Sequence, residues 1–319
     1  MYSIALLIPY FGKFDNIFPL WLKSCEINSS IDYIIITDST VKYSYPSNVK
    51  FLHYSFADLR KKIQKYYDFK ISLESPYRLC NFRPAFGEIF EDLINGYDYW
   101  GYCDVDLIWG NIRHFLPNDI SYDKIGTFGH LTMIKNSREN NRLYRYKNAY
   151  KIAFSNNLSL FFDENTFSKI CEKHKFKIFD LKIADLYPRY KNHYIVSERK
   201  NNIITKNIFS WDKQNGLYAI QKKENVFIKS EYAYVHFLKR PMINKVSNSD
   251  SFYIVPNYMI NTNEDYNTLF QRYCKNGLFY AYWRNSFKWK NFKERLLNRL
   301  YKNRIITNYI STMNQLINN

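Results

Sequence analysis

The stretch that decides the fold is Tyr97-Asp98-Tyr99-Trp100-Gly101-Tyr102-Cys103-Asp104-Val105-Asp106-Leu107-Ile108-Trp109-Gly110. An aromatic, strand-like run ends there in two carboxylates one residue apart, followed by a second apolar run and a glycine. Paired acids at the end of a buried strand are costly, because the charges repel each other and lose hydration. A bound divalent cation removes that cost, since hard cations prefer carboxylate oxygens and bridge to substrate phosphates. Asp104 and Asp106 point to the same side of an extended segment, so the stretch predicts a strand that ends at a metal site.

The residues before this stretch alternate between strand-like and helix-like patterns. Residues 3–9 and 33–37 are apolar on both faces, as strands of a parallel sheet are, and residues 50–54 predict a third strand. Helices are predicted over three intervening ranges, 18–25, 56–69 and 84–93. This alternation predicts an α/β fold with a mixed, mostly parallel sheet flanked by helices.

Polar or turn-forming residues follow three of the predicted strands. Pro9-Tyr10-Phe11-Gly12 follows the first strand, Asp38 ends the second, and the aspartate pair ends the strand quoted above. Ligands of open parallel sheets collect at the carboxyl ends of the strands. The three strand ends together predict one binding site.

The chain after residue 110 has a less regular pattern. Residues 124–134 predict strands, 138–153 and 164–174 predict helices, and 216–220, 225–229 and 232–238 predict short strands. We expect one continuous domain over residues 1–262 and a basic, aromatic, helical extension over residues 263–319. The extension suits either an anionic membrane surface or packing on the core with a solvated basic face.

Composition restricts the classes of partner. The chain has 319 residues and a net charge of +17, which attracts nucleic acid, acidic phospholipid and diphosphate substrates alike. No signal peptide is evident, and no run reaches the roughly 20 apolar residues that cross a bilayer. We therefore expect a cytoplasmic protein, with possible peripheral binding at the inner face of the membrane.

Several of these motifs together resemble bacterial glycosyltransferases of the GT-A fold. They are Ile8-Pro9-Tyr10-Phe11-Gly12, Thr37-Asp38, the Asp104-Val105-Asp106 motif and a late strand that contains His236. The chain more closely resembles an uncharacterised family of glycosyltransferase-like proteins of capsule and surface-polysaccharide synthesis. That likeness covers roughly residues 1–240 and is carried by Pro76-Tyr77-Arg78-Leu79-Cys80-Asn81-Phe82-Arg83-Pro84-Ala85-Phe86-Gly87 and Gly101-Tyr102-Cys103-Asp104-Val105-Asp106.

The resemblance implies roles for the first three strand ends. Asp106 would bind Mn²⁺ or Mg²⁺ directly, and Asp104 would contact the ribose or support the metal. Pro9, Tyr10, Phe11 and Gly12 would lie along the nucleotide, and Asp38 would bind its base or ribose. The alternatives are that Pro9 and Gly12 only shape a turn and that Asp38 only caps a loop.

His236 is the third metal ligand that the resemblance implies. Glycogenin-like transferases carry His-Phe-x-Gly-x-x-Lys-Pro-Trp, and this chain has His236-Phe237 without the following Gly and with Met242 in place of the Trp. Lys239 comes earlier than the Lys of that pattern, and the resemblance implies that Lys239 or Arg240 would contact the diphosphate. The alternative is that both are exposed basic residues after a strand. The alternative for His236 is a satisfied strand histidine.

Other polar residues are candidates for the donor or acceptor side. Arg78 and Arg83 offer planar guanidinium groups to phosphate or sugar oxygens, unless both are solvated. Asp163 and Glu164 are the candidate catalytic base, although an acid pair at a helix start is equally explained by capping. Weaker candidates are His130 for the acceptor side and Asp180 or Asp185 for the base.

The resemblance implies transfer of a hexose from a nucleotide diphosphate sugar to a glycan or lipid-linked acceptor. A UDP-sugar, with galactose or glucose first, is the favoured donor. The rival readings are a nucleic-acid-binding protein, for which no recognition motif is present, and a catalytically silent nucleotide-sugar-binding homologue.

Overall fold

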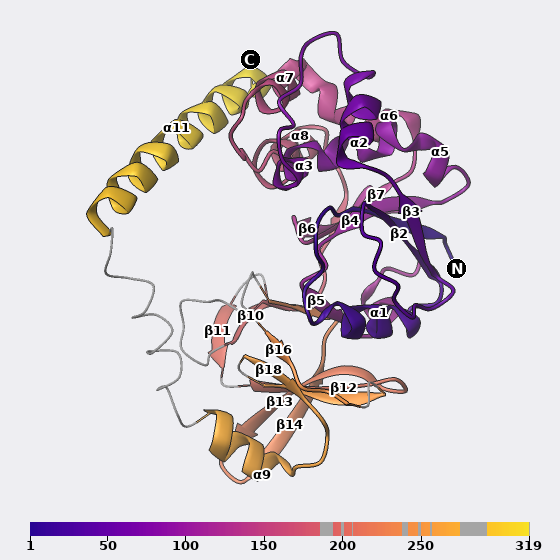
Figure 1. Ribbon diagram of the computed structural model, residues 1–319, viewed down its shortest axis with the longest axis vertical. Helices are drawn as coiled ribbons and strands as arrows, with labels where there is room; N and C mark the ends of the chain where they lie inside the picture. Colours follow the sequence, from indigo (N-terminus) through magenta and orange to yellow (C-terminus); the bar gives the residue numbers. More distant parts are fainter. Residues whose placement is uncertain are drawn as a thin grey trace.

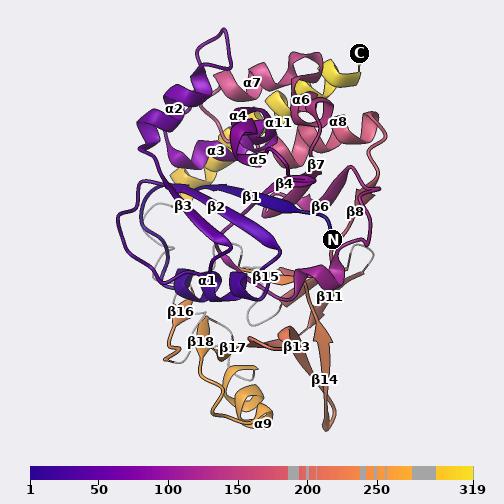
Figure 2. The same cartoon turned by 90° about the vertical axis from the view of Figure 1, so that its right-hand side faces the viewer.

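The computed structural model describes residues 1–185, 194–198, 201–205, 207–237, 242–247, 250–255, 257–274 and 292–318. Its largest element is a seven-stranded sheet that crosses the middle of the molecule (Figures 1 and 2). In sheet order the strands are β3 (Val49–His53), β2 (Ile31–Thr37), β1 (Ile4–Pro9), β4 (Tyr99–Cys103), β7 (Leu131–Lys135), β6 (Lys124–Phe128) and β8 (Ile178–Phe179). Only β7 runs antiparallel to its neighbours β4 and β6. The predicted mixed, mostly parallel sheet is therefore confirmed.

Both faces of this sheet are covered, which explains why its strands are apolar throughout. On one face, α1 (Phe18–Glu26) places Phe18 and Trp21 against Ile8 and Tyr33. The other face carries Leu7, Ile36 and Trp100, which pack against α2 (Phe56–Gln64) and later helices. Figure 1 shows α1 below the sheet and the other helices of this part above it. The remaining helices before the third sheet are η1 (Pro76–Arg78), α3 (Leu79–Phe82), η2 (Arg83–Ala85), α4 (Phe86–Ile89), α5 (Glu91–Ile94), η3 (Ile112–Phe115), α6 (Arg138–Arg142), η4 (Leu143–Asn148), α7 (Ala149–Ser155), η5 (Asp163–Phe167) and α8 (Ser168–Lys173).

The central strand β4 is packed too tightly for a side chain at its midpoint. A Cβ atom at Gly101 would lie 2.3 Å from the carbonyl oxygen of Thr132 on β7. All five residues of β4 are buried. The strand that leads to the aspartate pair is thus held on both edges and both faces, which gives the pair a rigid starting point.

The single helix predicted over residues 84–93 is wrong in one respect. The structure divides this range into η2, α4 and α5, with a break at Phe90, where φ is −117° and ψ is 31°. The Tyr66 hydroxyl donates to the carbonyl of Ile89 at 3.1 Å. The carbonyl of Ile89 therefore accepts a hydrogen bond from Tyr66, which follows α2, and not from the backbone of a continuing helix.

A second, smaller sheet begins directly after the aspartate pair. Its order is β11 (Asn201–Thr205), β10 (Tyr194–Glu198), β9 (Ile183–Asp185), β15 (Tyr234–His236) and β5 (Leu107–Trp109). His236 on β15 is level with Leu107 on β5 and with Asp185 on β9. This register brings β15, which is distant in the sequence, beside the aspartate motif.

A third sheet lies below the second in Figure 1. It consists of β14 (Val226–Glu231), β13 (Gly216–Lys223), β12 (Asn207–Asp212), β17 (Ser251–Val255), β18 (Tyr258–Ile260) and β16 (Ile243–Asn244). Trp211 of this sheet donates through its indole N–H to the carbonyl of Trp109 at 2.8 Å. The α9 (Tyr266–Leu269) and η6 (Phe270–Cys274) helices pack on its outer face through Leu269 and Phe270. The third sheet thus supports the second from the side opposite the central sheet.

The C-terminal extension ends in the long helix α11 (Phe292–Asn318). Met313 and Ile317 are buried in the same apolar cluster as Phe167 and Ile170, and Lys173 donates to the carbonyl of Ile317. The end of the extension therefore packs on the core, and the solvated basic face and the membrane surface both stay predictions. No helix in the described part of the chain combines the length and apolarity needed to span a membrane.

Candidate metal centre

The aspartate pair lies in the short connection between β4 and β5. The backbone N–H of Asp104 donates to the carbonyl of His130 at 3.0 Å, and the carbonyl of Asp106 accepts from the N–H of Phe237 at 2.9 Å. The pair is thus tied to the β6–β7 hairpin on one side and to the end of β15 on the other. The two carboxylates are partly exposed, with 30% and 26% of each side chain accessible.

His236 completes the group predicted from the sequence. Its Nε2 atom lies 3.4 Å from Oδ1 of Asp106 and 3.8 Å from Oδ2 of Asp104. The imidazole is buried, with 5% of the residue exposed. Asp104, Asp106 and His236 each offer one ligand atom, and these atoms lie within 4.8 Å of one another. His236, which comes 130 residues after Asp106 and 132 after Asp104, therefore meets the two aspartates at one point.

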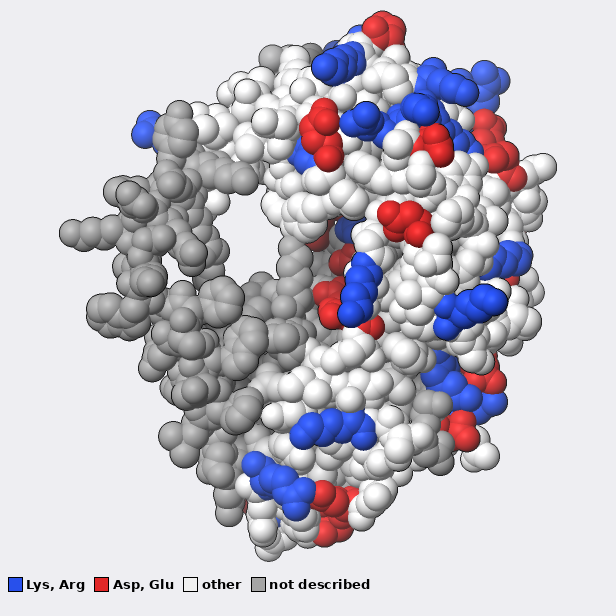
Figure 3. Space-filling model, in the orientation of Figure 1, with Lys and Arg blue, Asp and Glu red and all other residues white. Residues whose placement is uncertain are grey.

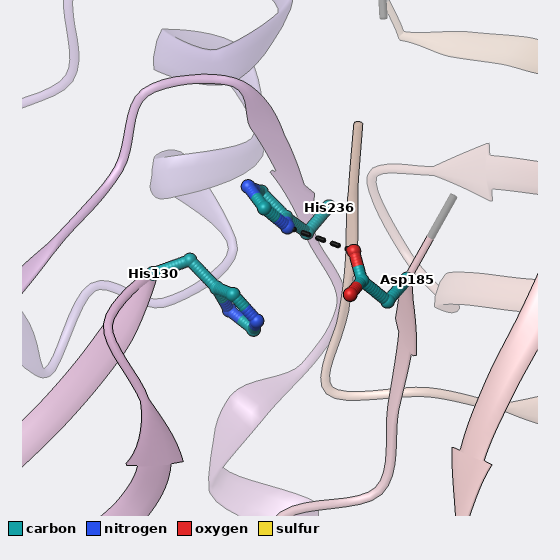
Figure 4. A group of neighbouring side chains, drawn as sticks. All are labelled: His130, Asp185 and His236. Atoms are coloured by element: carbon teal, nitrogen blue, oxygen red, sulfur yellow. Dashed lines mark hydrogen bonds and ion pairs between the residues drawn. The ribbon is translucent and has the colours of Figure 1, made fainter. Parts of the chain in front are cut away.

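The other nitrogen of His236 is held by a carboxylate. Nδ1 lies 2.9 Å from Oδ1 of Asp185, which ends the neighbouring strand β9 (Figure 4). Burial lowers the pKa of His236, but the hydrogen bonds with Asp106 and Asp185 outweigh it and raise the pKa to about 10. Without a cation the imidazole is therefore the positive partner of these carboxylates. A cation held at Nε2 would take the place of the proton there, while Asp185 would fix the ring.

The chemistry of these side chains fits a hard divalent cation. Two carboxylate oxygens and one imidazole nitrogen are a donor set that Mn²⁺ and Mg²⁺ accept, since both prefer oxygen ligands. A histidine ligand with a carboxylate on its second nitrogen is the usual supporting arrangement in metal sites. Figure 3 shows acidic side chains in a hollow of this face, with a basic side chain beside them.

His130 lies against the same histidine. The two imidazole rings stack with their centroids 4.2 Å apart, and the Phe128 ring also stacks on His130, with a centroid distance of 5.1 Å. Nδ1 of His130 shares a hydrogen bond of 2.9 Å with the hydroxyl of Tyr234. Burial, followed by the neighbouring His236, lowers the pKa of His130 well below its ordinary value, so this imidazole is neutral. The sequence predicted His130 for the acceptor side, and the structure places it beside the metal group.

Arg83 connects the aspartate motif to the second acid pair. Its guanidinium forms an ion pair with Asp104, and a second nitrogen lies 3.4 Å from Oδ2 of Asp163 and donates to the carbonyl of Gly129 at 2.9 Å. The guanidinium also lies 5.4 Å from the centroid of the Tyr102 ring. Burial alone would lower the pKa of Arg83, but Asp104 and Asp163 raise it above the ordinary value. Arg83 is therefore not a solvated surface arginine.

Asp163 and Glu164 both bind groups outside their own helix. Glu164 accepts the backbone N–H of Gly129 at 2.9 Å. Asp163 has 2% of its side chain exposed, and its Oδ1 has no hydrogen-bond partner among the described residues. Burial raises the pKa of Asp163 to about 6, although Arg83 acts in the opposite direction. Arg83 thus contacts both Asp163 of the acid pair and Asp104 of the aspartate motif.

The first strand end is built as a turn next to the second. Gly12 has a φ of +98° and donates its backbone N–H to Oδ1 of Asp38 at 3.0 Å, so these two predicted residues contact each other. Phe11 is buried in the core, whereas Tyr10 is half-buried and stacks on Phe14 at 4.4 Å. Burial raises the pKa of Tyr10, and Asp15 and Asp106 add to this, which places Tyr10 near the aspartate motif. Pro9 ends β1 beside Ile36.

One other predicted residue is not brought into this group, and two lie outside the described residues. Arg78 is buried and donates to the carbonyls of Ser72 and Asn156, so these hydrogen bonds join two loops. Lys239 and Arg240 lie outside the described residues. The predicted phosphate contacts stay predictions.

The contact between Asp185 and His236 was not predicted from the sequence. Asp185 was a weak candidate for the base, whereas the structure shows it bound to the metal-group histidine. A signal was present, because Ile183 and Ala184 precede Asp185 just as an apolar strand precedes Asp104. An acid thus follows a short apolar run at the end of β4 in the central sheet and again at the end of β9 in the second sheet.

Comparison with known proteins places the chain in a family. It belongs to the family described as "Family of unknown function (DUF6625)", whose model matches residues 6–263. Its structure is similar to that of mouse xyloside xylosyltransferase 1 in the apo form, with a TM-score of 0.32 and 13% sequence identity. That similarity covers 58% of this chain and 88% of the mouse chain. No curated protein matches the sequence.

Proposed function

We propose that this member of DUF6625 is a metal-dependent glycosyltransferase of the GT-A type that transfers a hexose from a nucleotide diphosphate sugar. The observation that supports it most is the convergence of Asp104, Asp106 and His236, with Asp185 on the second nitrogen of the histidine. The site lies where β1, β2 and β4 end, which is where open α/β sheets bind nucleotides.

Each residue has a defined part in this proposal. Asp106 and His236 hold Mn²⁺ or Mg²⁺ directly. Asp104 contacts the cation or the ribose, and its ion pair with Arg83 orients the Asp104 carboxylate. When bound, the cation supplies positive charge to the diphosphate leaving group. The turn from Pro9 to Gly12 and its partner Asp38 receive the nucleoside.

The acid pair is the proposed source of a general base. An inverting reaction needs a carboxylate that accepts the proton of the acceptor hydroxyl. A pKa of about 6 keeps Asp163 mostly ionised at neutral pH and basic enough to accept a proton. Arg83 and the Gly129 turn hold Asp163 and Glu164 in place.

The donor, acceptor and location follow the family resemblance stated from the sequence. The proposed donor is UDP-galactose or UDP-glucose. The proposed acceptor is a glycan or lipid-linked oligosaccharide of surface-polysaccharide synthesis, at the inner face of the cytoplasmic membrane. The net charge of +17 supports an anionic acceptor or surface.

Nucleotide-sugar binding with and without Mn²⁺ tests the proposal. We expect UDP-sugars to raise the melting temperature of the full chain only in the presence of Mn²⁺, and slow Mn²⁺-dependent hydrolysis of the sugar bond. Asp106→Asn should lose both effects. Asp68→Asn is the matched control, because Asp68 is 83% exposed and makes only a 3.9 Å ion pair with Lys151.

Two results would count against it. Stabilisation by Mn²⁺ and a UDP-sugar that survives in Asp106→Asn would exclude the assigned ligand. Donor binding without any hydrolysis or transfer would identify a catalytically silent nucleotide-sugar-binding homologue.

A further inference from the structure

His236 belongs to two groups of metal-ligating side chains. Its Nε2 faces Asp104 and Asp106, whereas its Nδ1 faces Asp185. The second group is His130, Asp185 and His236, whose ligand atoms also lie within 4.8 Å of one another (Figure 4). The two groups thus share one imidazole, whose Nε2 faces the aspartates and whose Nδ1 faces Asp185.

The second group is buried, unlike the first. His130, Asp185 and His236 are 6%, 8% and 5% exposed. They come from three separate elements, the β6–β7 hairpin, the end of β9 and the end of β15. Packing restricts the His130 ring, because Phe128 and His236 both stack on it and Tyr234 shares a hydrogen bond with its Nδ1.

One polar atom in this group is unaccounted for. Nε2 of His130 is buried and has no hydrogen-bond partner in the described part of the chain. A buried imidazole nitrogen without a partner costs free energy, because it has lost the hydrogen bond that it makes in water. A ligand at this nitrogen would remove that cost, and its neighbours in the group are a carboxylate and a second imidazole.

We propose that His130, Asp185 and His236 form a second cation site that takes a borderline metal ion such as Zn²⁺ and competes with the Asp104–Asp106 pair for His236. Two imidazoles and one carboxylate favour Zn²⁺ or Co²⁺, whereas the oxygen-rich pair favours Mn²⁺ or Mg²⁺. A neutral imidazole has one nitrogen lone pair, so His236 serves one group at a time. This inference goes beyond the proposed function, because it concerns metal binding and requires no sugar transfer.

Cobalt binding to the full chain separates the two groups. Co²⁺, a spectroscopic substitute for Zn²⁺, is titrated and followed by visible absorption, and Mn²⁺ is titrated separately by electron paramagnetic resonance. His130→Phe removes the nitrogen and keeps an aromatic ring against Phe128 and His236. Asp106→Asn disables the oxygen-rich group, and Asp68→Asn is the control for the loss of a surface carboxylate.

The proposal makes opposite predictions for the two variants. His130→Phe should weaken Co²⁺ binding by about tenfold or more and leave Mn²⁺ affinity within about threefold, and Asp106→Asn should do the reverse. Added Co²⁺ should lower the Mn²⁺ affinity of the unmodified chain, and His130→Phe should reduce that effect. If His130→Phe does not fold, His130→Gln serves in its place.

Two outcomes would overturn the second site. One is Co²⁺ binding that His130→Phe leaves intact and Asp106→Asn abolishes. The other is the absence of Co²⁺ binding by the unmodified chain at millimolar metal. Neither outcome bears on glycosyl transfer, because Mn²⁺-dependent donor binding is measured independently.

Discussion

Oδ1 of Asp185 lies 2.9 Å from Nδ1 of His236, across two parallel strands that bring these residues to the same level. This contact holds the ring so that its Nε2 atom points toward Asp104 and Asp106. Asp185 would therefore act through the histidine on a cation held at that motif.

The first prediction concerns this contact. Asp185→Asn should weaken Mn²⁺ binding by about 10- to 100-fold, because the amide no longer fixes the charge and orientation of the imidazole. Isothermal titration of Mn²⁺ into the full chain measures it, with Asp68→Asn as the control. Equal Mn²⁺ affinity in Asp185→Asn and the unmodified chain would show that His236 needs no such support.

The second prediction concerns Arg83. Arg83→Gln should lower the free energy of unfolding by about 3 kcal/mol or more, because the buried Asp163 carboxylate then lacks the guanidinium that pairs with it. The same change in Arg60 should cost less than about 1 kcal/mol, since its ion pair with Glu74 is exposed. Urea denaturation of both variants makes the comparison.

A double variant tests the cause. If Asp163 is the group left unpaired, adding Asp163→Asn to Arg83→Gln should recover part of the lost stability. Simple additivity of the two substitutions would show that Arg83 stabilises the protein by some other contact.

The third prediction follows from the pKa of Asp163. Its folded value of about 6 lies above the ordinary value of 3.8, so the folded protein holds the proton more tightly than the unfolded chain does. The stabilisation from this group is therefore complete below about pH 4 and is lost as the pH rises through 6. The loss amounts to about 3 kcal/mol for this difference in pKa.

Unfolding free energies at pH 4.5 and 7.5 measure this effect. Asp163→Asn should remove most of it, so the unmodified chain should lose more stability between the two pH values than the variant does. An identical pH dependence in both proteins would mean that Asp163 titrates near its ordinary pKa in the folded state.

The fourth prediction concerns the C-terminal helix. Met313 is fully buried in the cluster beneath α7 and α8, whereas Leu316 is 39% exposed. Met313→Ala should destabilise the protein by about 2–5 kcal/mol, and Leu316→Ala should cost about 0.5 kcal/mol or less. Similar melting temperatures for the two variants would show that the helix does not depend on this packing.

Much of the architecture could be predicted from local patterns. The apolar runs that became β1, β2 and β4 are continuous because both faces of the central sheet are buried, and this signal is contained in each segment by itself. Asp104, Asp106 and His236 could be grouped because a resemblance to known motifs linked them. The helix at 84–93 was misjudged at Phe90, because the hydroxyl that engages the carbonyl of Ile89 comes from Tyr66, far from the local pattern.

The sequence by itself determined the strands, their burial and the acids at their ends, since these depend on the period of apolar residues and on neighbours along the chain. Only the tertiary structure decided that Asp185 binds His236, that Arg83 joins Asp104 to Asp163, and that His130 stacks on His236. Those contacts join residues 21 to 106 positions apart, and their energies depend on side-chain geometry across strands. No local pattern carries that information, because sheet register and packing arise only when the whole chain is folded.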